Sequence, residues 1–75
     1  MDTFEKLRAI IADVLSINPK EITPESTPKD LDADSIDMLD VVGEAEQTFQ
    51  VEITDEALES FDTIGDFAAY IEERL

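Results

Sequence analysis

The chain has 75 residues, enough for one domain with a small core, and 43% of them are hydrophobic. Twenty acidic residues against five basic ones give a net charge of −15, which disfavours binding to nucleic acid or to an anionic membrane surface. The sequence contains no His and no Cys, which excludes disulfides, thiol nucleophiles and histidine-based catalysis. No apolar run approaches the ~18 residues of a membrane span, and the N-terminus lacks the pattern of a signal peptide. We therefore expect one domain over residues 1–75, a monomer located in the cytoplasm.

The first predicted helix spans residues 3–15. Asp2 followed by Glu5 is typical of a capping box, and the acidic first turn suits the helix dipole. Apolar residues recur at helical spacing and form one stripe, which contains Phe4, Leu7, Ile10, Ile11, Val14 and Leu15. The pair Asn18-Pro19 prevents the helix from continuing.

A long connection over residues 16–34 follows, and it contains all three prolines of the chain. Loops of this length in small domains usually have a role or some internal order. The residues expected to hold this connection to the core are Ile17, Ile22 and Leu31.

The second predicted helix runs from Ser35 to Phe49, with Asp34 as its N-cap and Asp37 in its first turn. One sector must face the core, and it contains Met38, Val41, Val42, Ala45 and Phe49. Ile36 and Leu39 project toward the opposite side among acidic residues. This helix is therefore predicted to have a broad buried face and a small outward apolar patch.

The remaining chain predicts a short extended link at residues 50–53, a brief helix at 55–60, and a last helix. The last helix begins after Asp62 or Thr63 and ends near Arg74, and Thr63 with Asp66 is typical of a capping box. The predicted fold class is all-α: a small bundle of three main helices plus one short helix, with a long loop between helices one and two.

Ser35 is the strongest candidate for a functional atom, because it stands where a loop becomes a helix and the backbone N–H groups there favour an anion such as a phosphate ester. A catalytic serine would need a His or Lys base and a glycine-rich elbow, which this segment lacks. The acidic run from Asp30 begins like a calcium loop, but Ser35 and Val41 stand where that loop needs Gly and Glu. We therefore expect neither an enzyme nor a specific metal site, although weak divalent binding on charge grounds stays open.

The run Leu31-Asp32-Ala33-Asp34-Ser35-Ile36-Asp37 resembles the Asp-Ser-Leu signature of acyl carrier proteins, and the likeness extends over essentially the whole chain, including residues 51–56 and 63–71. The resemblance implies that a carrier protein transferase attaches 4′-phosphopantetheine from coenzyme A to Ser35, beside Asp34. The thiol of that arm would then hold an acyl group as a thioester. The resemblance also implies docking on acyl-chain enzymes with basic patches, through Asp34, Ile36, Asp37, Leu39, Asp40 and Glu46. The cavity that holds the acyl chain would be lined by Val41, Ala45 and Ile53.

The sequence departs from the family pattern at three positions. Asp32 stands where the family commonly has Gly, Gly43 where a larger apolar residue such as Met is frequent, and Gln47 where an acid is common. Asp34 before the serine favours an acyl carrier over a peptidyl carrier, and the extent of the sequence suggests a free-standing carrier. Fatty acid, polyketide and aminoacyl cargo stay open. So does an acidic, carrier-like interaction module without a prosthetic group.

Overall fold

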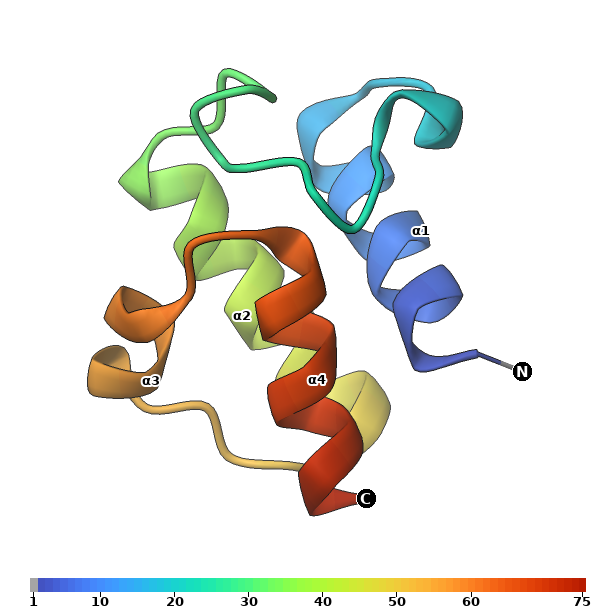
Figure 1. Cartoon of the computed structure of the whole chain (residues 1–75). Coiled ribbons are helices and arrows are strands. Elements are labelled where there is room, and N and C mark those ends of the chain that lie inside the picture. Colours follow the sequence, from blue (N-terminus) through green and yellow to red (C-terminus); the bar gives the residue numbers. More distant parts are fainter. Residues whose placement is uncertain (1) are drawn as a thin grey trace.

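The computed structural model describes residues 2–75, and within this range every regular element is helical. The elements are α1 (Thr3–Leu15), a 3-10 turn η1 (Pro19–Glu21), α2 (Ser35–Phe49), α3 (Asp55–Ser60) and α4 (Ile64–Arg74). Figure 1 shows α1, α2 and α4 as the main helices, with the long connection crossing one end of the bundle. The predicted all-α bundle is confirmed, whereas η1 was not predicted. Among the described residues, no helix is long and apolar enough to cross a membrane.

The helices begin where side chains satisfy their first backbone N–H groups. Asp34 and Asp37 form a full capping box at the start of α2, and Thr63 and Asp66 form another at the start of α4. In the first box, Asp37 N donates to Asp34 Oδ1 at 2.8 Å and Asp34 N donates to Asp37 Oδ2 at 3.2 Å. An N-cap of this kind stabilises a helix by about 1 kcal/mol. These local bonds explain why the predicted helix starts are correct.

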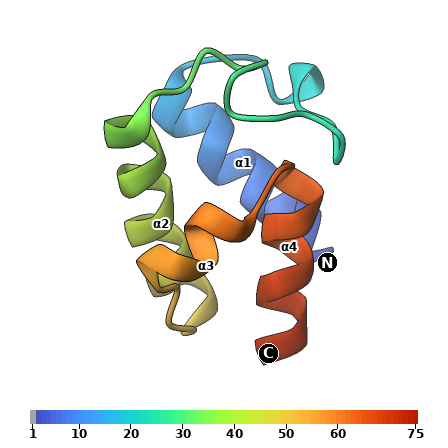
Figure 2. The ribbon, with the colours of Figure 1, turned by 60° about the vertical axis from the view of Figure 1, so that its left-hand side comes forward.

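The core lies where α1, α2 and α4 face one another, and α3 lies at the side of the bundle between α2 and α4 (Figure 2). The predicted inner face of α2 is confirmed, because all five of its apolar residues are buried. Ile22 is fully buried and holds the long connection to the core, while Ile17 and Leu31 are partly buried against it. The largest fully buried side chains are those of Phe67, Leu7, Ile11, Ile22, Ile64, Ile71 and Val41.

The long connection is also bonded to the first turn of α4. Ile64 N donates to the carbonyl oxygen of Ser26 at 2.9 Å, and Gly65 N donates to that of Pro24 at 2.8 Å. A Cβ atom on Gly65 would lie only 2.9 Å from the oxygen of Pro24, so this position requires glycine for close backbone approach. The loop that leads to Ser35 is therefore an ordered part of the fold.

Candidate functional site

Ser35 is the first residue of α2, and its side chain is exposed. The capping box of Asp34 and Asp37 fixes the turn that presents it. The first N–H groups of a helix have no acceptor within the helix, and together with the helix dipole they favour a negatively charged group. The hydroxyl oxygen of Ser35 is thus accessible to a modifying enzyme, at an end of the helix that suits a phosphate ester.

The turn before Ser35 contains a strained residue. Ala33 N donates to the carbonyl oxygen of Pro28 at 2.9 Å, which closes a tight turn, and Asp32 within it has a φ of 59°. This left-handed conformation costs L-residues about 1–2 kcal/mol, although Asp and Asn tolerate it better than most. The left-handed φ explains why glycine would suit the position of Asp32.

The outward apolar patch, which consists of Ile36 and Leu39, is present. The two side chains are 70% and 55% exposed, and the exposed Asp40 lies next to them in the sequence. Gly43 lies further along the same face of α2, but it has no side chain that could enlarge the patch. A Cβ atom at this position would meet nothing within 4 Å. The open surface at Gly43 shows that no neighbouring backbone requires this glycine.

Glu46 differs from the other acidic residues assigned to the partner surface. Its Oε2 atom accepts a hydrogen bond from Ile53 N, seven residues further along the chain, at 2.8 Å, whereas the side-chain bonds of Asp34 and Asp37 stay within their capping box. Glu46 therefore holds the link between α2 and α3 to the end of α2. A contact of Glu46 with a partner enzyme stays a prediction, as do the partner contacts of Asp34, Asp37 and Asp40.

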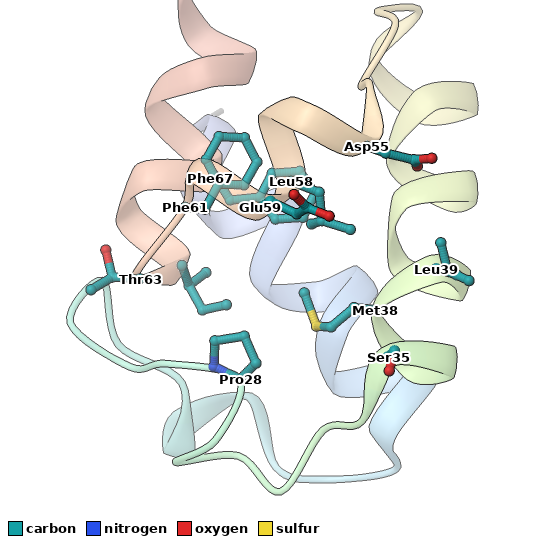
Figure 3. Close-up of a pocket in the computed structure, with 11 residues that line it drawn as sticks. Pro28, Ser35, Met38, Leu39, Asp55, Leu58, Glu59, Phe61, Thr63 and Phe67 are labelled. Atoms are coloured by element: carbon teal, nitrogen blue, oxygen red, sulfur yellow. The ribbon is translucent and has the colours of Figure 1, made fainter.

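A cavity of about 410 Å³ lies between α2, α3, the start of α4 and the long connection (Figure 3). Ser35 itself lies at its border, and Met38 follows one turn later on α2. The apolar lining is completed mainly by Leu58, Phe61, Ile64 and Phe67. An exposed serine and an apolar cavity are therefore neighbours in this fold.

The acyl-chain lining predicted from the sequence is not the lining of this cavity. Val41 and Ala45 are fully buried and Ile53 is 5% exposed, so all three are core residues, but none of them borders the cavity. Contact of these three residues with a bound acyl chain stays a prediction. Sequence reasoning missed Phe61 and Phe67, because the cavity depends on where α3 lies, and helical periodicity carries no signal for that.

Acidic residues far outnumber basic residues in this protein, by 20 to five. In residues 2–75 the only ion pair within 4.0 Å joins Arg74 and Glu73, at 3.8 Å, and both side chains are exposed. Over the same residues, no group of three or more acidic side chains is arranged to hold a metal ion. Fifteen acidic residues lie between Lys29 and Arg74 with no basic residue among them. The surface around Ser35 therefore carries a strong negative potential.

Comparison with known proteins gives a consistent result. A family profile described as "Phosphopantetheine attachment site" matches residues 5–71. The chain is 44% identical over 73 residues to a protein named acyl carrier protein from Helicobacter hepaticus, covering 96% of each. It is 49% identical over 71 residues to one from Clostridium perfringens, covering 93% of each. It is also 45% identical over 74 residues to one from Streptococcus pneumoniae, covering 99% of this chain and 97% of the relative.

Proposed function

The chain belongs to the acyl carrier protein family, and from this premise we propose that Ser35 is the residue to which its 4′-phosphopantetheine arm is attached. The observation that carries the proposal is the exposed hydroxyl of Ser35 at the first position of α2. Its neighbour Asp34 is occupied in the capping box and sets the geometry of the turn. The residues present fit the group, because the start of α2 favours a phosphodiester and the apolar cavity begins beside it.

The protein carries acyl groups on this arm and is a carrier rather than a catalyst. Attachment joins the Ser35 oxygen to the pantetheine phosphate of coenzyme A, while the hydroxyl proton and the nucleotide bisphosphate leave. The arm supplies the thiol on which an acyl group is held as a thioester. The chain has no Cys, so the arm brings the reactive sulfur that the sequence lacks.

The attachment is tested by incubation with a broad-specificity carrier protein transferase, coenzyme A and Mg²⁺, followed by measurement of the intact mass. Wild-type protein should gain the mass of one phosphopantetheine group, and Ser35→Ala should gain nothing. Ser60→Ala is the matched control, because Ser60 is also an exposed serine on a helix, and this variant should be modified like wild type. A mass gain that survives Ser35→Ala would overturn the assignment.

The family acts together with synthesis enzymes, and we propose that the partners here are enzymes of fatty acid synthesis in the cytoplasm, with polyketide synthesis as the alternative. A monomer would dock through the outward apolar patch and the acids Asp34, Asp37, Asp40 and Glu46 onto a basic surface. Electrostatic complementarity of this kind raises association rates more than affinity, which suits partners that exchange quickly. The association rate should therefore fall steeply as salt is added.

A further inference from the structure

Gly43 lies in the middle of α2, where glycine weakens a helix relative to alanine. The fold does not compensate for this cost. Gly43 is exposed, a Cβ atom there would meet nothing within 4 Å, and no glycine among residues 2–75 has a positive φ. Neither packing nor backbone conformation therefore requires glycine at this position. The remaining physical reason for a bare backbone here is contact with another molecule.

Gly43 belongs to the outward face of α2. It follows Ile36 by seven residues and Leu39 by four, so all three lie on one side of the helix. Figure 3 shows Ser35 and Leu39 one turn apart on α2. Two exposed aliphatic side chains are thus followed by a gap in the row of side chains, between Leu39 and Gln47, which we call the Gly43 gap. At 1.5 Å per residue, the gap lies about 12 Å along the helix from Ser35.

The charges around the Gly43 gap select the kind of molecule that fits it. Asp40 and Glu44 are exposed beside the gap, and no basic residue occurs between Lys29 and Arg74. A second copy of this chain, with its net charge of −15, or an anionic lipid surface would be repelled. A protein surface that carries Lys or Arg would be attracted, so the gap suits a basic protein partner.

The enzyme that attaches the arm is the partner that has to cover this region, because it must bring its active site to Ser35. A standard protein interface covers about 800 Å² on each partner, which corresponds to a radius of roughly 16 Å. An interface of this size centred near Ser35 includes the Gly43 gap. Interface cores pack as densely as protein interiors, and large side chains that fill pockets contribute most of the binding energy. The gap therefore offers a place for a side chain of the enzyme.

We propose that the Gly43 gap receives a large apolar side chain, which the carrier protein transferase of the native host projects from among its basic residues. The inference rests on the proposed function, because the transferase docks here only if Ser35 is its target. Gly43 is thereby a specificity-determining residue of the docking surface. It lowers the stability of α2 and leaves open the space that the enzyme fills.

The test measures kcat and KM for attachment of the arm by the transferase of the native host, with intact mass as the readout. Gly43→Met fills the gap and Gly43→Ala fills it in part. Both variants should melt at a higher temperature than wild type, because they remove a glycine from a helix. Ala9→Met is the matched control, because it places the same side chain at an exposed position of a helix, away from α2.

Gly43→Met should raise KM by about tenfold or more with little change in kcat, because the added atoms take the space of the enzyme's side chain. Gly43→Ala should raise KM by a smaller factor, and Ala9→Met should behave like wild type. An unchanged or lower KM in Gly43→Met, or an equal rise in Ala9→Met, would overturn the inference. The mass gain of wild type tests the Ser35 assignment separately: if wild type gains the arm and all variants share its KM, only the inference about Gly43 fails.

Discussion

Gly65→Ala should lower the free energy of unfolding, even though alanine is the better helix former. Within a helix, alanine gains about 1 kcal/mol over glycine. Against this gain, the new Cβ atom would lie 2.9 Å from the carbonyl oxygen of Pro24 and 3.3 Å from its Cβ atom. This oxygen belongs to the backbone, so the long connection or the start of α4 must shift to relieve the contact.

The cost of that shift follows from the bonds it disturbs. Overpacking of this kind costs about 1–3 kcal/mol. The shift also lengthens the 2.8 Å bond from Gly65 N to Pro24 O, whose loss would cost about 1 kcal/mol. After the gain in helix propensity, the net loss is about 1–3 kcal/mol, and each 1 kcal/mol lowers the melting temperature by about 4–8 °C in a domain of this size.

The assay is urea and thermal unfolding followed by far-ultraviolet circular dichroism. Gly43→Ala is the matched control, because it makes the same substitution within a helix at a position where nothing lies within 4 Å. This control should raise the free energy of unfolding by about 0.5–1 kcal/mol. If Gly65→Ala stabilised the protein as much as Gly43→Ala, the close approach between the long connection and α4 would be refuted.

Three other substitutions or conditions test the account. In urea unfolding, Asp32→Gly should be more stable than Asp32→Ala by about 1 kcal/mol. Both variants remove the same charge, but only glycine accepts a φ of 59° without strain. Equal stabilities of the two variants would contradict this explanation. Glu46→Ala should lower the free energy of unfolding by about 1–2 kcal/mol, because Ile53 N loses its acceptor. Asp40→Ala, on the exposed face of α2, should not lower it. If Asp40→Ala destabilised the protein more than Glu46→Ala, the 2.8 Å bond would be unimportant for stability. Added NaCl, and more strongly Mg²⁺, should raise the melting temperature, since the acidic residues repel one another; an unchanged melting temperature from low to moderate salt would count against it.

The helices could be predicted because their signals are local. Asp34 with Asp37 and Thr63 with Asp66 marked the starts of α2 and α4, and both capping boxes are present. The apolar stripe of α2 faces the core as its spacing indicated. The close approach of Pro24 to α4 was not predictable, because it joins residues about forty positions apart through backbone atoms that carry no side-chain signal.

The candidate site was predictable only in part. The exposed position of Ser35 at the start of α2 and the outward apolar patch could be predicted from capping and helical periodicity on one helix. The role of Ser35 as an attachment site stays a prediction. The lining of the cavity could not be predicted, because it depends on the position of α3. This short helix has no buried residue, and the rest of the fold sets its position. The hydrogen bond from Ile53 N to Glu46 could not be predicted from the sequence either, since it requires the chain to return to the end of α2.

The most direct test of the central claim is the intact mass of the protein purified from its native host, with fragmentation of the peptide that contains Ser35. The account predicts an added phosphopantetheine group, free or acylated, located on the oxygen of Ser35. An unmodified protein in its native host, or an adduct on any other residue, would contradict it.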